Sequence, residues 1–249
     1  LMMAMVRCNV PSVFVHGGSA MPGRMPGAHG ADLNIVDTYE TLGRLLAGEA
    51  TREQLDIVTR ACLPTAGACA GQFTANTMGM VSEALGLAPI GSSMVPAVYS
   101  ERAPLLRRAG KALMQAVLGG GPLPRDIVTR EAIENACALV CATGGSTNAA
   151  LHLPAIAHEA GIRFHLDDVA AVFARTPLIA DLKPGGQYLA RDVHSIGGAG
   201  VILRALLDQG LLHGDALTFT GRTLAQELAA CAAPDGEVVR QRLQARGLE

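Results

Sequence analysis

Hydrophobic and polar residues follow two periods along this chain, one typical of helices and one typical of extended backbone. Apolar positions three and four apart, often preceded by a capping Asp or Thr, predict helices. A short β-branched run at residues 10–16 predicts a buried strand, and residues 162–166 predict a second strand. The helical spacing predicts helices over residues 2–9, 37–47, 51–61, 74–85, 103–118, 131–141, 146–160, 167–175, 198–209 and 223–232.

The alternation of strand-like and helix-like segments predicts the class of fold. We expect an α/β domain with three layers, α/β/α, and with glycine-rich turns at strand ends, where such sheets place their ligands. This domain would span residues 1–240. Residues 241–249 are charged and predict an exposed tail, and residues 21–30, which contain two Pro-Gly pairs, predict a loop.

The composition excludes several classes of function. The 249 residues carry a formal net charge of -2, and only 3% are aromatic. Without a basic surplus or aromatic stacking residues, we expect no nucleic-acid partner. No apolar run approaches the roughly eighteen residues that cross a bilayer, so we expect no membrane partner. The six cysteines are scattered through the chain, which fits free thiols in a reducing, cytoplasmic setting.

A first glycine-rich turn, PTAGACAGQFTANTM at residues 64–78, carries one cysteine, Cys69, between small neighbours. It runs into a predicted helix, whose unpaired N–H groups favour anions and thiolates. A stabilised thiolate is a good metal ligand, although Cys69 alone cannot hold a metal. The alternative is a buried structural thiol. Thr74, Asn76 and Thr77 then face either a cluster or substrate, or simply cap the helix.

A second turn, TGGSTNAALHL at residues 143–153, has the same design. Ser146, Thr147 and Asn148 open a predicted helix after two glycines, so they either bind an anionic group or cap that helix. His194, beside Gly197 and Gly198, is a further candidate for lining an active site. His16, at the end of the first predicted strand, is another.

The remaining polar pairs have simpler explanations. Asp167 and Asp168 precede a predicted helix, and N-terminal capping accounts for them better than a metal pair does. Cys137 and Cys141 share one helical face, where burial as small hydrophobes is favoured over a metal pair. Burial is also expected for Cys8 and Cys231, and Cys62 is at most an accessory ligand. These five cysteines and two aspartates therefore add no site of their own.

Several long motifs in this chain resemble one known family. Two of these motifs, residues 63–87 and 142–153, include the glycine-rich turns. The others are residues 10–18, 123–128 and 192–198. Together these motifs resemble the dihydroxy-acid and sugar-acid dehydratases, over about residues 2–240. The resemblance identifies residues 1–240 as part of the N-terminal α/β domain of such a dehydratase.

The resemblance implies a hydro-lyase that removes water from a 2,3-dihydroxy acid to give a 2-keto acid. Family members use an iron–sulfur cluster held by three cysteines, and Mg²⁺ held by carboxylates and a modified lysine. Cys69 matches the third cluster cysteine, while the cluster type, 2Fe-2S or 4Fe-4S, is left open. The sequence of residues 64–78 and 84–91 is more similar to the dihydroxy-acid branch of the family, which serves branched-chain amino acid biosynthesis, than to the phosphogluconate branch. A sugar-acid (aldonate) or phosphogluconate dehydratase is the alternative.

Other family motifs do not occur in these 249 residues, including the Cys-Asp-Lys motif and the serine base. We therefore expect a central fragment without both flanks, and we assign no catalytic residue. The complete enzyme would be a homodimer, whereas the isolated chain would self-associate, bind neither cluster nor Mg²⁺ stoichiometrically and show no turnover. A scaffold fragment without chemistry is the alternative from another class. A nucleotide-binding module lacks the required Gly-Lys-Ser/Thr ending.

Overall fold

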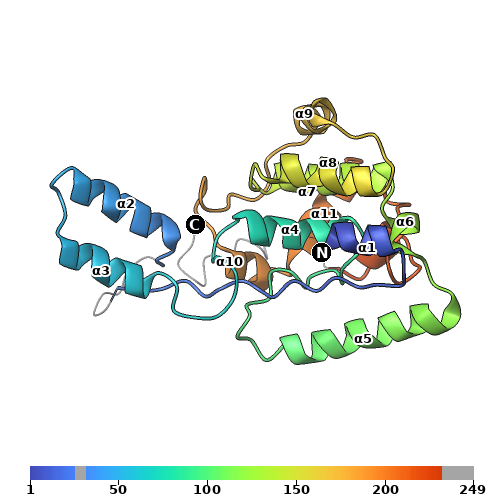
Figure 1. Cartoon of the computed structure of the whole chain (residues 1–249), viewed down its shortest axis with the longest axis horizontal. Helices are drawn as coiled ribbons and strands as arrows, with labels where there is room; N and C mark the ends of the chain where they lie inside the picture. The colour runs from blue at the N-terminus through green and yellow to red at the C-terminus, as the bar shows by residue number, and fades with distance from the viewer. Residues whose placement is uncertain (26–31, 232–249) are drawn as a thin grey trace.

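The computed structural model describes residues 1–25 and 32–231, and within these residues the chain is predominantly helical (Figure 1). The predicted tail at 241–249 lies outside the described residues. The helices are α1 (Met2–Cys8), α2 (Ile35–Leu46), α3 (Arg52–Ala61), α4 (Thr74–Ala84), α5 (Arg102–Gly119), α6 (Pro124–Ile127), α7 (Arg130–Ala142), α8 (Ala149–Glu159), α9 (Leu166–Arg175), α10 (Ala190–Ser195), α11 (Ala199–Asp208) and α12 (Leu224–Leu228).

All ten predicted helices are present, most of them within two residues of their expected ends. The exceptions have local causes. Helix α8 begins at Ala149 because residues 146–148 form a turn, and α12 ends at Leu228 rather than at 232. Two short helices, α6 and α10, were not predicted, since four and six residues are too few for a helical period to show.

The core is built around α4 and α7, which pack against each other near the middle of the molecule (Figure 1). Nearly every residue of α4 from Asn76 onward is buried, and so are most residues of α7. The buried side chains of the core are mainly Ala, Leu, Val and Ile, and the many small alanines permit this close approach. Helices α8, α9 and α11 pack around these two helices. The first glycine-rich turn leads into α4 and the second follows α7, so both turns adjoin the buried centre of the protein.

The predicted strands are not formed, and the three-layer prediction is therefore confirmed only for its helices. The described residues contain isolated bridges instead, including a parallel one between Ser19 and Ala68. Residues 10–16 run beside the core as an irregular segment, with one backbone bond from Phe14 N–H to Leu87 C=O at 2.8 Å. A β-branched run favours extended backbone, but a strand also needs a neighbouring strand, and the described residues supply none.

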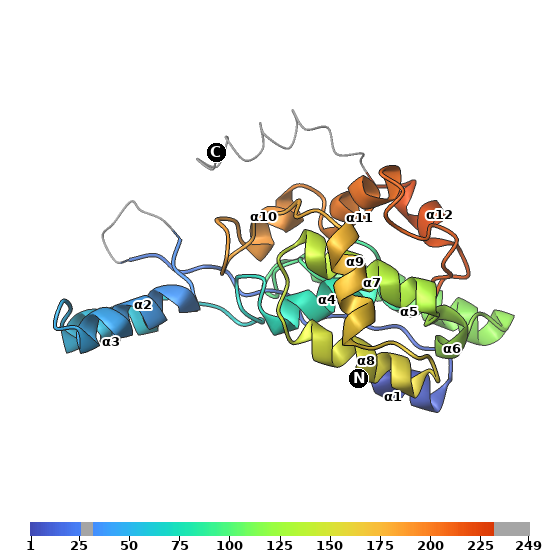
Figure 2. The same cartoon turned by 90° about the horizontal axis from the view of Figure 1, so that it is seen from above.

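Helices α2 and α3 form a hairpin that projects from the body in both views (Figures 1 and 2). Capping boxes fix both of its starts. At α2, Asn34 Oδ1 accepts from the Val36 N–H and Asp37 accepts from the Asn34 N–H. At α3, Thr51 and Gln54 bond each other's backbone N–H groups. An ion pair between Asp32 and Arg191 ties the base of the hairpin to α10. The start of α2 is thereby placed beside the first glycine-rich turn.

Gly67 offers a test of this turn, because its backbone has a φ of +125° and a Cβ there would lie 2.5 Å from the Ser19 carbonyl oxygen. Gly67→Ala should lower the free energy of unfolding by at least about 2 kcal/mol, through backbone strain and loss of the adjoining bridge. The matched control is Gly43→Ala in α2, where a Cβ meets nothing within 4 Å. It should stabilise by about 0.5–1 kcal/mol. Urea unfolding that gives equal stabilities for both variants would contradict this geometry.

Candidate functional site

Cys69 lies in the turn between α3 and α4, with its side chain half-buried. Burial raises the pKa of its thiol, and the backbone N–H groups of Gly71, Ala70 and Ile35 oppose that shift. Ile35 is the first residue of α2, so the sulfur also faces a second helix start. The sequence predicted a stabilised thiolate, whereas the net shift favours the thiol. A bound metal ion would replace the proton, and the three N–H groups would then share the charge of the sulfur.

The backbone around Cys69 is held from two sides. Asn76, fully buried in the first turn of α4, donates from Nδ2 to the carbonyl oxygens of Cys69 (2.6 Å) and Gly71 (2.7 Å). From the other side, Ala190 N–H donates to Ala70 C=O at 2.8 Å. Gln72 N–H donates to Lys183 C=O at 2.7 Å. Every carbonyl from residue 69 to residue 71 therefore has a fixed direction.

The two glycine-rich turns meet at the start of α4, although they are about seventy residues apart in sequence. Thr74 Oγ1 lies 3.1 Å from Ser146 Oγ and accepts a hydrogen bond from Asn148 Nδ2 at 2.8 Å. Thr77, which is buried, accepts from Ser146 N–H at 3.0 Å. Of the two predicted roles, capping is seen in part, because Ser146 Oγ also accepts from the Asn148 N–H at 3.3 Å just before α8. Phe73 is the N-cap of α4, and Asn148 makes no capping bond at α8.

Two of the predicted site residues lie elsewhere in the fold. Thr147 is exposed and borders a groove between α8 and α9 together with Leu151 and His165. His194 belongs to α10, where its Nε2 lies 3.1 Å from Glu101 and its ring meets the edge of Tyr99. A role for either residue in substrate binding stays a prediction.

His16 is buried beneath this region rather than exposed in it. Its Nδ1 lies 3.1 Å from both Gly18 N and Ser93 O, and burial lowers the pKa of the imidazole. In one tautomer of the neutral ring Nδ1 accepts from the Gly18 N–H, and in the other it donates to the Ser93 carbonyl. We therefore interpret His16 as a core histidine that holds the Gly17–Gly18 turn.

Sequence reasoning missed Glu83, which is fully buried in α4. Its carboxylate accepts from the backbone N–H groups of Gly91 (2.6 Å) and Ser93 (2.7 Å). Burial raises its pKa to about 7, and the two N–H groups limit the rise. A signal was present, since Ser82 and Glu83 interrupt an otherwise apolar run just before Gly86. The residue fixes the loop behind α4 and does not face the turns.

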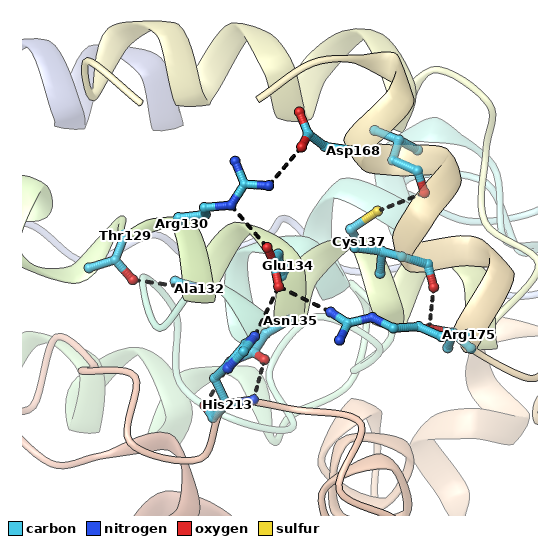
Figure 3. A network of polar contacts seen from close by, with 12 residues as sticks. Thr129, Arg130, Ala132, Glu134, Asn135, Cys137, Asp168, Arg175 and His213 are labelled. Carbon is cyan, nitrogen blue, oxygen red and sulfur yellow. Dashed lines mark hydrogen bonds and ion pairs between the residues drawn. The ribbon is translucent and has the colours of Figure 1, made fainter. Parts of the chain in front are cut away.

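A network of polar contacts surrounds the N-terminal half of α7 (Figure 3). Glu134 contacts Arg130 (3.1 Å), Arg175 (3.0 Å) and His213 (3.0 Å). Asp168 pairs with Arg130 at 2.7 Å and accepts from the His165 N–H, which confirms the capping prediction for this aspartate. The network joins α7 to α9 and to the segment before α12. Its groups satisfy one another, so it carries a structural role.

Among the described residues, no other cysteine completes a three-residue ligand group with Cys69, although the charge of Cys62 adds to the rise in the pKa of Cys69. Cys62 is buried and accepts from Thr38 Oγ1 at 3.2 Å, and Cys137 is buried with its pKa raised to about 12 by burial. Cys141 is half-buried and donates to the Thr176 carbonyl at 3.2 Å. Cys8 is exposed, so its predicted burial is wrong. It is the last residue of α1, where the helix leaves the core.

The residues therefore fit an iron–sulfur cluster only as the donor of one thiolate, Cys69, with backbone N–H groups around its sulfur. Among residues 1–25 and 32–231, no group of three or more His, Cys, Asp or Glu side chains is close enough to hold a metal ion. In particular, Mg²⁺ finds no carboxylate cluster there. Within the same residues, no helix is long and apolar enough to cross a membrane.

Comparison with known proteins identifies the family. The family described as dihydroxy-acid/6-phosphogluconate dehydratase N-terminal matches residues 1–227, and the chain belongs to it. The chain is 61% identical over 239 residues to dihydroxy-acid dehydratase 3 of Bradyrhizobium diazoefficiens, covering 96% of this chain and 40% of the relative. It is 61% identical over 240 residues to dihydroxy-acid dehydratase 2 of Bordetella bronchiseptica, covering 96% and 42%. The chain thus spans about two fifths of these relatives.

The junction of the two turns can be tested through Thr77. Thr77→Val keeps the shape of the side chain but removes the acceptor for the Ser146 N–H, which should cost about 1–2 kcal/mol of stability. The matched control is Thr41→Val in α2. There the hydroxyl donates to the Asp37 carbonyl within the same helix, so the change should stay within about 0.5 kcal/mol. Thermal unfolding that ranks the two variants in the opposite order would contradict the described junction.

Proposed function

We propose that this chain forms the Cys69 side of the active site of a hydro-lyase, which removes water from a 2,3-dihydroxy acid to give a 2-keto acid. The observation that carries the proposal is the half-buried Cys69 sulfur, which faces three backbone N–H groups in a turn that is fixed from two sides. Family membership and the names of the relatives support the reaction, which we place in branched-chain amino acid biosynthesis.

Cys69 is the residue that would hold the cofactor, as one thiolate ligand of an iron–sulfur cluster, 2Fe-2S or 4Fe-4S. When bound, such a cluster supplies a Lewis acid for the departing hydroxyl group. The N–H groups of Ala70, Gly71 and Ile35 would stabilise the sulfur charge. Beside them, Thr74, Ser146 and Asn148 would offer donors to the hydroxyl or carboxylate groups of the substrate.

Mg²⁺ belongs to the proposal only through the family resemblance. The described residues offer it no carboxylate cluster, so we assign no step to it and no general base to this chain. The substrate partner is a small dihydroxy acid. We further propose a cytoplasmic location, supported by six cysteines that are all free. A homodimer is supported by exposed apolar side chains such as Leu46 and Leu118.

Two alternatives remain, each with a supporting observation. The description of the family includes 6-phosphogluconate, which supports a sugar-acid (aldonate) or phosphogluconate dehydratase. The lack of a three-residue ligand group in the described part of the chain supports a scaffold fragment without chemistry. The relatives are named dihydroxy-acid dehydratases, and this favours the first proposal over both.

A chimera tests these proposals. Residues of this chain would replace the matching 239-residue segment of the Bradyrhizobium relative, and the product would be loaded with iron, sulfide and Mg²⁺ under anaerobic conditions. We expect it to convert 2,3-dihydroxyisovalerate to the keto acid, and to turn over aldonic acids and 6-phosphogluconate much more slowly. Turnover of the sugar acids alone would overturn the dihydroxy-acid proposal. A folded, iron-loaded chimera without any turnover would favour the scaffold alternative.

A further inference from the structure

The side-chain amide of Asn76 makes an unusual pair of contacts. Its Nδ2 donates to the carbonyl oxygens of Cys69 and Gly71, at 2.6 and 2.7 Å, and these are its contacts to the turn. Its Oδ1 is buried and has no hydrogen-bond partner among the described residues. Since both neighbours of Nδ2 are acceptors, the orientation of the amide follows from the contacts themselves.

These two bonds act on the backbone that surrounds the Cys69 sulfur. The carbonyl of Cys69 and the N–H of Ala70 belong to one planar trans peptide, so they point in opposite directions. A donor that fixes the carbonyl therefore fixes the N–H as well. The Ala70 N–H is one of the groups beside the sulfur, and Ala190 fixes the next peptide in the same way through the Ala70 carbonyl.

We propose that Asn76 is a positioning residue for Cys69, which keeps the Ala70 N–H directed at the sulfur and so holds the thiolate in a metal-binding orientation. Asn76 contacts the turn from α4, a helix that is buried along most of its length, so the packing of the core also restrains the turn. The part of this inference that concerns metal binding rests on the proposed function. The part that concerns the backbone does not.

The first test uses the chain itself. Asn76→Asp keeps the shape of the side chain but loses both donors, and Asn76→Ser removes the amide without adding a buried charge. We expect amide hydrogen exchange at residues 70–72 to become about tenfold faster or more in either variant, because these bonds close the turn. The matched control is Asn135→Asp, since Asn135 is also fully buried and donates to the His213 carbonyl at 2.9 Å. It should accelerate exchange near 213 and leave 70–72 unchanged.

The second test uses the iron-loaded chimera, with its visible absorption and its iron content as readouts. Asn76→Ser should shift the sulfur-to-iron absorption bands or lower the iron content at least severalfold, and Asn135→Asp should do neither. Unchanged exchange at 70–72 in Asn76→Ser would overturn the positioning role, whatever the iron content. If Asn76→Asp fails to fold, Asn76→Ser alone decides. The chimera with Asn76 in place could also bind no iron while Asn76→Ser still accelerates exchange at 70–72. That result would refute the cluster proposal but support the backbone role of Asn76.

Discussion

Replacing Cys69 by Ser should abolish cluster binding in the iron-loaded chimera and reduce dehydration to the background rate. The serine hydroxyl stays protonated at neutral pH and is a poor ligand for iron, while the N–H groups of Ala70 and Gly71 would still surround it. Iron and acid-labile sulfide per chain, measured together with keto acid formation, check this expectation.

Cys141→Ala is the matched control, because Cys141 is also half-buried and free. Its sulfur donates to the Thr176 carbonyl on the far side of α7, so its loss should alter local packing and leave the iron content intact. Equal iron content in the Cys69→Ser and Cys141→Ala proteins would remove Cys69 from the proposed ligand set.

Glu83 should give the protein a stability that falls as pH rises. Its folded-state pKa of about 7 lies above the ordinary value of 4.5, so the folded protein binds the extra proton between these values. The free energy of unfolding should therefore drop by about 3 kcal/mol between pH 4.5 and pH 7 and then level off. The contribution of this carboxyl group is fully present below its unfolded pKa and is lost as it ionises.

Urea unfolding of the wild type and of Glu83→Gln, compared at several pH values, isolates this effect. His16 is buried with a lowered pKa and acts in the opposite direction, and it is present in both proteins. The stability difference between the two proteins should therefore change by about 3 kcal/mol across the same pH range. A difference that stays constant with pH would show that Glu83 does not titrate within the folded core.

Helices were predictable from the sequence because their signals are local. Thr51 caps α3, as the predicted helix starting with a threonine implied, and Asp168 caps α9 as expected. The strand at 10–16 was not, since its β-branched residues favour extended backbone but do not determine whether a partner strand is near. For that reason, the helices of the expected three-layer α/β fold are present among the described residues, whereas the strands of its sheet are not.

In the candidate site, too, features with a local sequence signal were predictable and features that depend on tertiary packing were not. Cys69 was found through its turn and its small neighbours, and the meeting of Thr74 with Ser146 follows from packing that no local pattern encodes. The direction of the Cys69 pKa was predicted wrongly, because burial outweighs the nearby N–H groups and depends on the whole fold. Asn76 was noted as polar and near the turn, but its contact with two carbonyls required coordinates.

The role of Cys69 as an iron ligand can be tested directly by an anomalous difference map at the iron absorption edge, from crystals of the iron-loaded chimera grown without oxygen. We expect an iron peak within bonding distance of the Cys69 sulfur, beside the turn where Thr74, Ser146 and Asn148 meet. Iron peaks bound elsewhere in the protein, with the Cys69 sulfur free of metal, would contradict it.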